Sequence, residues 1–346
     1  HLSSVCIDID NALELANEQL LTQIQTELQQ GDGENQVVYR QQRYVSRLVR
    51  RQGDRLASDT PQTGAVQLKI SDYGSFENLN AVPQTRTAPA PGEVEIAVRA
   101  SGLNFRDVLN ALGMLREYAD DLGIDAAEEI PFGGECAGVV AAVGEGVTDF
   151  QVGDAVMAAF SLGSLSSYVT VRQEFVVAKP ANLSFEAAAT LPIAFLTAHY
   201  ALRCQADMKA GDRVLIHSAA GGVGQAAVQL AQQAGADIFG TASPGKWDFL
   251  KENGVRHVLN SRTVEFAEQV LAATNGTGVD IVLNSLNGDF IPKSLETLKQ
   301  NGRFVEIGKL GIWDAEQVQA VRPDATYLPF DLLDIATEQP TVIADM

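Results

Sequence analysis

A short glycine-rich run is the first place in this sequence where residue types and spacing point to chemistry. It extends from Ser218 to Gly224, follows the apolar residues 214–216 and precedes an alanine-rich helical stretch. A strand, a glycine turn and a helix in this order are typical of dinucleotide sites, because the helix N-terminus offers free N–H groups and partial positive charge to phosphates. We expect Gly221 to let the backbone approach a pyrophosphate, and Gly224 to let the helix pack close to the strand.

The run departs from the usual motif at one position. Ala219 stands where G-x-G-x-x-G has its first glycine, so the bare pattern is weak, and a glycine turn without a nucleotide is the alternative. The regular units that follow the turn favour the nucleotide. The predicted cofactor-binding residues of the turn are Ala219, Gly221, Gly222, Val223 and Gly224.

The second predicted strand, residues 237–241, ends without the acidic residue that binds the ribose 2′-hydroxyl in NAD sites. Thr241, Ser243 and Lys246 occupy this region instead, and Arg262 follows the third predicted strand. Hydroxyl groups with two cations and no carboxylate suit a 2′-phosphate. The sequence therefore predicts NADPH as the cofactor. The alternative is that Lys246 and Arg262 are ordinary surface charges.

These side chains depend on a regular succession of strands and helices. Further strands are expected at residues 255–259, 280–283 and 303–307, with helical stretches between them, which predicts a doubly wound parallel sheet. Residues 64–200 differ, because Val94, Ile96 and Val98 alternate and frequent Gly and Asp turns predict a small β-barrel. The expected fold class is therefore α/β, with a Rossmann-type sheet and a separate β-barrel domain.

Bulk composition excludes several classes of protein. The chain has 346 residues, 46% of them hydrophobic, and a net charge of −19, which argues against a nucleic acid partner. No apolar run is long enough to span a membrane, so no membrane partner is expected. Cys6, Cys136 and Cys204 lie far apart, which favours a reducing, cytoplasmic location over a disulfide framework.

Four segments are expected along the chain. Residues 1–63 form an N-terminal appendage, with a helix beginning near Asp10 and strands at 36–39 and 44–49. Residues 64–200 form the barrel domain, and residues 201–325 form the nucleotide-binding domain. Residues 326–346 are expected to begin an incomplete return to the barrel domain. The absence of an initial Met suggests a piece of a longer protein.

Several longer motifs occur in an order known from one family. They are Leu103-Asn-Phe-Arg-Asp107, the stretch 143–156, Leu191-Pro192 with Thr197-Ala198, the stretch 217–224, Ser243-Pro-Gly-Lys-Trp247 and Leu283-Asn-Ser-Leu286. Over residues 65–330 the chain resembles the zinc-independent enoyl reductase domains of modular polyketide synthases, within the medium-chain dehydrogenase/reductase superfamily. The resemblance implies that the barrel is a GroES-like substrate domain, and that Thr197, Asn284 and Asn104 contact the cofactor.

Zinc is the first chemical question for this superfamily. Its zinc-dependent members carry Gly-His-Glu where this chain reads Gly133-Gly-Glu135. A catalytic zinc needs three protein ligands, and a structural zinc usually needs four. The scattered cysteines and His199, His217 and His257 supply neither set. A metal-free enzyme is therefore expected, which disfavours alcohol oxidation.

The resemblance implies reduction of an enoyl thioester carried on the phosphopantetheine arm of an acyl carrier protein. Hydride addition at the β-carbon leaves an enolate, whose oxygen is stabilised by backbone N–H groups and whose α-carbon needs a proton. The family places a lysine and an aspartate near the nicotinamide, and Lys293 and Asp314 are the candidates here. For Lys293 the alternative is a lysine that faces solvent.

Arg106, Asp107 and Leu115 are expected to line the substrate cleft, with a structural ion pair as the alternative for Arg106 and Asp107. Many polyketide enoyl reductases read Gly-Met-Tyr-Pro just after this motif, whereas this chain reads Gly113-Met-Leu115-Arg116. The missing hydroxyl leaves open the proton source and the α-carbon configuration. An enolate trapped by displacement of a leaving group within the substrate is a further alternative.

Two other functions stay open at this level. One is a stand-alone NADPH quinone or alkenal reductase, and the other is a silent NADPH-binding scaffold domain. The expected partners are the acyl carrier protein and neighbouring domains of a synthase. A monomer and a homodimer both fit the sequence.

Overall fold

The structure is a computed structural model that describes residues 6–9, 36–40, 42–45, 64–116, 124 and 126–346. The chain divides into two compact units, His1–Thr60 and Pro61–Met346. In the first unit, β1 (Cys6–Ile9) pairs in parallel with β2 (Gln36–Arg40), which pairs antiparallel with β3 (Gln42–Val45). The strand predicted at 36–39 is thus confirmed, while the helix predicted near Asp10 lies outside the described residues.

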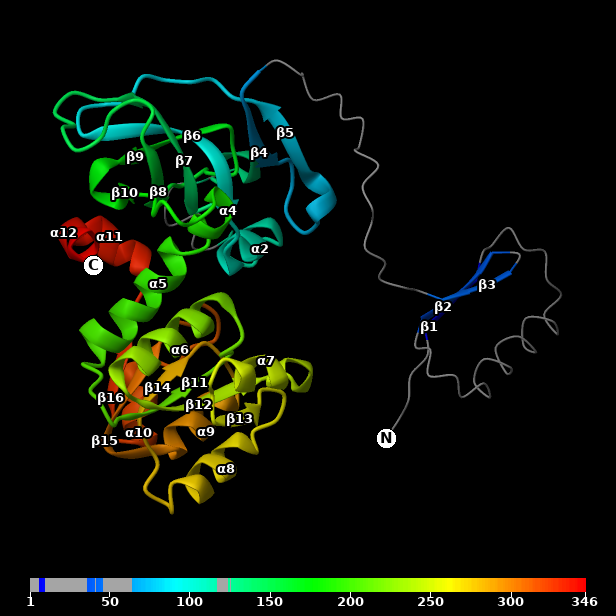
Figure 1. Cartoon of the computed structure of the whole chain (residues 1–346). Coiled ribbons are helices and arrows are strands. Elements are labelled where there is room, and N and C mark those ends of the chain that lie inside the picture. Colours follow the sequence, from blue (N-terminus) through cyan, green and yellow to red (C-terminus); the bar gives the residue numbers. More distant parts are fainter. Residues whose placement is uncertain (1–5, 10–35, 41, 46–63, 117–123, 125) are drawn as a thin grey trace. The chain divides into compact units, whose positions relative to one another are not determined.

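A six-stranded parallel sheet forms the centre of the nucleotide-binding domain (Figure 1). Its order, β13-β12-β11-β14-β15-β16, is that of a doubly wound dinucleotide-binding fold, so the predicted fold class is confirmed. The strands are β11 (Arg213–Ile216), β12 (Asp237–Ala242), β13 (His257–Asn260), β14 (Val279–Asn284), β15 (Leu298–Glu306) and β16 (Thr326–Pro329).

Helices cover both faces of this sheet because its strands are apolar on both sides (Figure 1). In β11, Val214 and Ile216 pack toward α6 and α7, while Leu215 packs toward α8, α9 and α10. These helices are α6 (Gly222–Ala234), α7 (Trp247–Glu252), α8 (Phe266–Ala273), α9 (Phe290–Glu296) and α10 (Ala315–Val321), with the short 3₁₀ turn η5 (Pro244–Lys246) before α7.

The barrel domain predicted for residues 64–200 is built on antiparallel strands. Five of them form a sheet in the order β10-β8-β7-β6-β9, and a two-stranded sheet joins it through a bridge between Gln67 and Ser166. The strands are β4 (Val66–Ile70), β5 (Leu79–Pro83), β6 (Glu93–Gly102), β7 (Glu135–Val143), β8 (Ala155–Ala159), β9 (Tyr168–Arg172) and β10 (Val176–Ala178). The helices are α2 (Phe105–Ala111), η1 (Phe76–Asn78), η2 (Ala127–Glu129) and η3 (Gln173–Phe175).

Two segments connect these domains. The first runs through α4 (Phe185–Ala188), α5 (Pro192–His199) and a π-helical turn η4 (Tyr200–Gln205) into β11. The second is the C-terminal segment, α11 (Leu332–Glu338) and α12 (Pro340–Asp345), which packs against Tyr200 and the barrel residues Phe160 and Phe175. One boundary differs from expectation: residues 326–329 are the sixth strand of the nucleotide sheet, and the return begins after Pro329.

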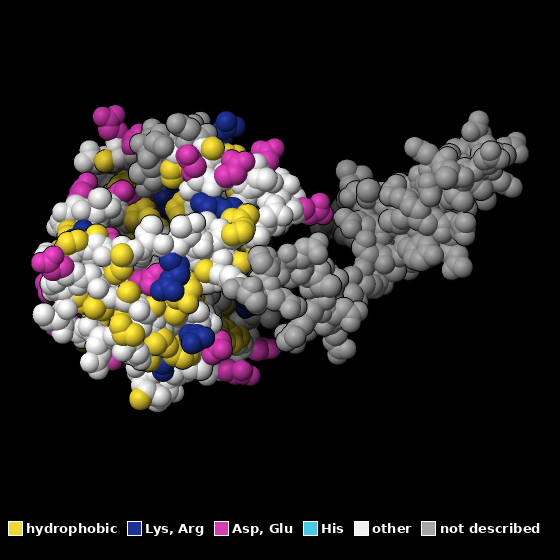
Figure 2. Space-filling view, turned by 90° about the horizontal axis from the view of Figure 1, so that it is seen from above, with side chains coloured by type: hydrophobic (Ala, Val, Ile, Leu, Met, Phe, Trp, Pro, Cys, Tyr) yellow, Lys and Arg dark blue, Asp and Glu magenta, His cyan; other side chains and the backbone are white. Residues whose placement is uncertain are grey.

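The distribution of basic side chains on the surface agrees with the net charge of −19. On the face of the second unit seen in Figure 2, basic side chains are scattered among acidic and apolar ones rather than gathered in one patch. Within the described residues, none of the helices combines the length and hydropathy needed to cross a bilayer.

Candidate active site

The glycine turn between β11 and α6 is held in place by the end of the neighbouring strand β12. Ser218 adopts a left-handed conformation with φ +52°, which a non-glycine residue rarely takes. Its N–H donates to Thr241 Oγ1 at 3.2 Å, and the next N–H, of Ala219, donates to the Thr241 carbonyl at 2.9 Å. Gly221 N–H then donates to Ser218 O at 2.7 Å, which closes the turn.

The glycines of the turn have different reasons to be glycine. A Cβ on Gly224 would collide with Ser218 O and the Ala219 backbone, so the close packing predicted for this position is present. A Cβ on Gly222 would meet nothing within 4 Å, so this glycine faces open space at the helix N-terminus, where a phosphate is predicted. Ala219, in place of the first glycine, is accommodated by Gly240 opposite, where a Cβ would lie 3.0 Å from the Ala219 methyl group.

A buried histidine explains why Thr241 faces inward. His217 Nδ1 lies 3.1 Å from Thr241 Oγ1, and its Nε2 lies 2.7 Å from Ser294 Oγ on α9. Because Ser294 donates its hydrogen to Phe290 O, His217 must donate from Nε2 and accept from Thr241 at Nδ1. Burial lowers the pKa of His217 to about 3, so the ring is neutral. Thr241 was predicted to bind the cofactor, but its hydroxyl is committed to the turn and fully buried.

The predicted 2′-phosphate residues gather at one edge of the sheet. Ala242 pairs with Asn260 in the parallel register of β12 and β13, so Ser243 and Arg262 follow neighbouring strand ends. Lys246 and Arg262 are exposed, and neither cation has an ion-pair partner among the described residues. The strand ends that carry Ser243 and Arg262 are therefore neighbours, and Lys246 lies three residues after Ser243, in η5.

Asn284 and Asn104 are each engaged by a buried glutamate. Asn284 is fully buried at the end of β14, and its Nδ2 donates to Leu286 O and to Glu306 Oε2. Asn104 donates its amide to Glu135 Oε1 at 2.7 Å. Both side chains thus hold the frame of the cleft. Thr197, the third predicted contact from the resemblance, is half-buried on α5, which packs against α6.

Glu135 joins three elements that meet at the cleft. Its second carboxylate oxygen accepts the N–H of Ile193 at 2.8 Å, in the first turn of α5, while the first oxygen accepts Asn104 before α2. Gly102 makes room for this carboxylate, since a Cβ there would lie 2.5 Å from Glu135 Oε1. Burial raises the pKa of Glu135, and the two hydrogen bonds oppose that rise. Glu135 therefore positions α2 and α5 relative to the barrel.

A lysine and an aspartate do meet in a cavity, but they are not the pair predicted. Lys309 Nζ lies 2.7 Å from Asp331 Oδ2, and Arg106 Nη1, from α2, lies 3.8 Å from the same oxygen. Lys309 follows β15, and Asp331 follows β16, so both lie beyond the carboxyl ends of the parallel strands. They line a cavity of about 270 Å³ with Glu306, Gly308, Ile312, Pro329 and Phe330.

Glu306 is the other ionisable group of this cavity. It is 1% exposed, and its two oxygens accept Gly308 N–H and the Asn284 amide, each at 2.6 Å. Burial raises the pKa of Glu306 to about 7, against the opposing effect of these hydrogen bonds and of Lys309. A raised pKa in a cavity is a common mark of a functional carboxyl group.

Lys293 and Asp314 have structural roles instead. Lys293 lies on α9 with 41% of its side chain exposed and forms an ion pair with Glu296 at 2.8 Å, which raises its pKa through the hydrogen bond. Asp314 caps α10, where its Oδ1 accepts Gln317 N–H at 2.8 Å. The structure therefore offers Lys309 and Asp331 in their place. Lys309 could have been found from its position just after the strand predicted at 303–307, whereas Asp331 follows β16, which the sequence did not predict.

The predicted cleft residues separate in the structure. Arg106 points to Asp331, whereas Asp107 is buried and accepts the backbone N–H groups of Asn104 and Gly133 at 2.9 and 2.8 Å. Asp107 is thus a support of the loop rather than a lining residue, and it is not the ion-pair partner of Arg106. Leu115 is half-buried beyond α2, just before residues 117–123, which lie outside the described part.

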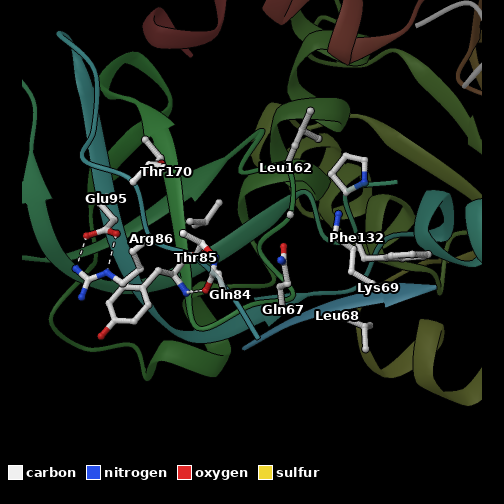
Figure 3. A pocket seen from close by; sticks show the side chains of 15 residues that line it. Gln67, Leu68, Lys69, Gln84, Thr85, Arg86, Glu95, Phe132, Leu162 and Thr170 are labelled. Atoms are coloured by element: carbon white, nitrogen blue, oxygen red, sulfur yellow. Dashed lines mark hydrogen bonds and ion pairs between the residues drawn. The ribbon is translucent and has the colours of Figure 1, made fainter. Parts of the chain in front are cut away.

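A second cavity, of about 220 Å³, lies on the barrel between β4 and β9 (Figure 3). Figure 3 shows Arg86 and Glu95 next to each other at one side of it, and they are joined by hydrogen bonds of 2.9 and 2.6 Å. The Arg86 guanidinium also stacks 3.9 Å from the Tyr168 ring centre, and Gln84 bonds both backbone groups of Tyr168. These polar groups satisfy one another, so the cavity is best interpreted as a structural joint of the barrel.

Two family models match the chain. The "Alcohol dehydrogenase GroES-like domain" model matches residues 90–181, and the "Zinc-binding dehydrogenase" model matches residues 222–341. The residues present do not fit a zinc site: in the described ranges, no three His, Cys, Asp or Glu side chains gather as metal ligands would.

Similar proteins point to one class of enzyme. The chain is 46% identical over 280 residues to the pikromycin polyketide synthase component PikAII of Streptomyces venezuelae, a match that covers 79% of this chain and 7% of that protein. It is 57% identical to the CurK enoyl reductase, with a TM-score of 0.80, over 81% of this chain and 85% of that one. The CurF ER cyclopropanase from the curacin A biosynthetic pathway is 46% identical, with a TM-score of 0.77, over 81% and 85%.

Proposed function

The chain belongs to the enoyl reductase domains of polyketide synthases, within the medium-chain dehydrogenase/reductase superfamily, and from this premise we propose that it reduces an α,β-unsaturated thioester with NADPH. The observation that carries the proposal is the Lys309–Asp331 pair in a cavity at the carboxyl edge of the sheet. The turn on the same edge has the features of a dinucleotide site.

The residues of the nucleotide domain fit the proposed cofactor. Open space at Gly222 admits a pyrophosphate to the N-terminus of α6. Lys246 and Arg262 supply two cations for a 2′-phosphate, and within the described residues neither is engaged in an ion pair. Ser243 adds a hydroxyl at the same edge. When bound, NADPH would supply the hydride that reduces the β-carbon of the substrate.

Lys309 is the proposed proton donor. Reduction at the β-carbon leaves an enolate, and its α-carbon then takes a proton from the Lys309 ammonium, which water later restores. Asp331 Oδ2 lies 2.7 Å from Lys309 Nζ and so holds the ammonium at a fixed place in the cavity, where a positioned acid can deliver its proton. This donor supplies the proton without the tyrosine hydroxyl that this chain replaces with Leu115.

The proposed substrate is an acyl group on the phosphopantetheine arm of an acyl carrier protein, with neighbouring synthase domains as partners. The support is that this chain spans 7% of the first synthase it matches, so its relatives are parts of much larger assemblies. A stand-alone quinone reductase would turn over free quinones instead. A silent scaffold domain would bind NADPH without oxidising it.

The test follows NADPH absorbance with a pantetheine-linked enoyl thioester and with a free quinone. We expect the thioester to be reduced in preference, and Lys309→Ala to lower kcat by roughly 10²–10⁴-fold. Lys293→Ala is the matched control, because this lysine is partly exposed and paired on α9, and it should retain the activity. Quinone turnover alone, or equal loss in the two variants, would overturn the proposal.

One observation favours a second reaction on the same site. A 46% identical structure is named a cyclopropanase, and Leu115 offers no hydroxyl proton. With a leaving group on the γ-carbon, the enolate α-carbon can form a bond to that carbon as chloride departs, which closes a ring without a proton. A γ-chloro enoyl thioester tests this: released chloride with a cyclopropane product supports it, and a saturated γ-chloro product contradicts it.

A further inference from the structure

We infer that Glu306 is a positioning residue for the proton donor: its carboxylate clamps the loop that carries Lys309 to the end of β14. This inference rests on the proposed function, in which Lys309 delivers the proton. Glu306 itself is not proposed to touch the substrate. Its part is to fix where the ammonium of Lys309 stands.

The clamp joins two strand ends through one side chain. Glu306, the last residue of β15, accepts Gly308 N–H with Oε1 and the Asn284 amide with Oε2, each at 2.6 Å. Gly308 directly precedes Lys309, so the first bond sets the direction in which the backbone enters the loop that carries this lysine. The second bond ties that loop to β14.

Asn284 completes the clamp because its amide has no spare bonding capacity. Its Nδ2 donates to Leu286 O at 2.7 Å as well as to Glu306, and its Oδ1 accepts Leu286 N–H at 3.2 Å. Asn284 O also accepts Ile307 N–H at 3.0 Å. The turns after β14 and β15 are therefore locked to each other by side-chain and backbone bonds together.

Gly308 is shaped for this contact. A Cβ at this position would lie 2.8 Å from Glu306 Oε1 and 3.2 Å from Ile312 Cγ2. Any larger residue would push the carboxylate away from its two donors. The backbone at Gly308 needs no positive φ, so the close approach of the carboxylate is the reason for glycine here.

Burying a carboxylate to join two strands costs free energy, because the charge loses its hydration, unless neighbouring groups interact with that charge. The charged and titratable groups around it are Lys309 after β15, Asp331 after β16 and Tyr327 on β16, whose pKa is raised to about 12 by burial and by the nearby Glu306 charge. Both Glu306 oxygens accept N–H donors, so a proton on either oxygen removes the charge that strengthens these two bonds.

The clamp is therefore strongest when Glu306 is ionised. Because the pKa of Glu306 is raised to about 7, the ionised fraction increases as the pH rises through neutrality. The turnover rate of the wild-type protein should therefore increase as the pH rises through neutrality, which gives its pH profile an acidic limb. That limb belongs to a group that neither donates nor accepts the substrate proton.

The decisive variants exchange donor and acceptor across the clamp. Glu306→Gln presents an amide N–H₂ to one of the two donors, and we expect kcat to fall roughly 10- to 100-fold at saturating NADPH and thioester, with the acidic limb lost. Adding Asn284→Asp places a carboxylate opposite this new amide, so the bond between the two side chains re-forms with its direction reversed. Because the bond from Asn284 to Leu286 O is lost, only a small part of kcat should return. Gly308→Ala should reproduce the Glu306→Gln defect from the other side of the contact.

A second readout does not depend on turnover. Competitive acetylation, read by mass spectrometry, compares Lys309 with Lys293 in one sample. Reactivity of Lys309 relative to Lys293 should rise at least threefold in Glu306→Gln and fall again in the double variant, while NADPH affinity measured by fluorescence stays unchanged.

The outcomes separate the inference from the proposed function. A wild-type protein that reduces no thioester overturns the proposed function, and the acetylation ratios still decide whether Glu306 holds Lys309. Wild-type kcat, an unchanged pH profile and unchanged acetylation in Glu306→Gln overturn the inference. A loss that appears only as a higher KM for NADPH also overturns it, because the role would then be cofactor binding.

Discussion

Lys309 and Lys293 carry the same ammonium group in different surroundings, and the difference decides what each can do. Lys293 pairs with Glu296 three residues along α9, an exposed contact that contributes little to stability. Lys309 pairs with Asp331 from another part of the chain, beside a carboxyl group with a pKa raised to about 7. Of the two lysines, Lys309 is the one that stands in a cavity beside other ionisable groups brought together by the fold.

Thr241 offers a prediction at this same scale. Thr241→Val keeps the shape of the side chain but leaves His217 Nδ1 and the Ser218 N–H without a partner in a buried place. We expect a loss of roughly 1–3 kcal/mol in the free energy of unfolding, together with weaker NADPH binding, by denaturant titration and fluorescence. The control is Thr337→Val, an exposed hydroxyl on α11 that bonds Leu333 O. Equal effects of the two changes would contradict the role assigned to the His217 network.

The glycine turn shows what an element adds to its residues. The small residues of this turn look alike in the sequence, yet a Cβ on Gly224 would meet the backbone of its own turn and a Cβ on Gly222 would meet empty space. Ala219 is tolerated because the partner strand supplies Gly240, which is a fact about two elements together. Ala219 replaces the first glycine of G-x-G-x-x-G, and Gly240 on the neighbouring strand leaves the space that its methyl group needs.

Two alanine substitutions separate packing from binding in this element. Gly224→Ala should destabilise the fold by roughly 1–3 kcal/mol, because its methyl group has no room. Gly222→Ala should leave stability within about 1 kcal/mol of wild type, since alanine suits a helix, and yet weaken NADPH binding about tenfold or more by filling the approach to the N–H groups. Thermal unfolding and NADPH titration of both variants test this. If Gly222→Ala binds NADPH normally, the pyrophosphate does not bind at this turn.

We predict that the cofactor preference is set at the edge formed by β12 and β13. Lys246→Ala and Arg262→Ala should each raise the Kd for NADPH about tenfold, because a charge-assisted bond to the 2′-phosphate is lost, while the Kd for NADH stays the same. Lys251→Ala, which removes an exposed partner of Asp248 on α7, is the control. Equal losses for NADH and NADPH would place these cations elsewhere than at the 2′-phosphate.

At the scale of the whole molecule, local patterns predicted the elements better than the contacts between them. The strand order follows from the alternation of strands and helices, and five of the six sheet strands were expected near their observed bounds. The cavity was not predicted, since Arg106, Lys309 and Asp331 come from separate stretches that meet only when the C-terminal segment crosses back toward the barrel. Choosing Lys293 and Asp314 relied on nearness to motifs, whereas the fold selects residues that follow the ends of β15 and β16.

Asp331 gives the prediction that belongs to the assembled molecule. One oxygen caps α11 through Leu333 N–H at 2.8 Å, and the other joins Lys309 with Arg106 of the barrel domain. Asp331→Asn keeps a good helix cap and removes the charge, so unfolding free energy should fall by less than about 1 kcal/mol. Turnover should fall roughly 10- to 100-fold, because the Lys309 ammonium loses the carboxylate that holds it in position. Glu174→Gln, which breaks an exposed pair with Arg172, should change neither quantity by more than about twofold in rate or 0.5 kcal/mol in stability. If Asp331→Asn lowers the stability but leaves turnover unchanged, Asp331 only connects the two domains, and the assignment of Lys309 as proton donor loses its support. Both quantities must therefore be measured on the same preparation.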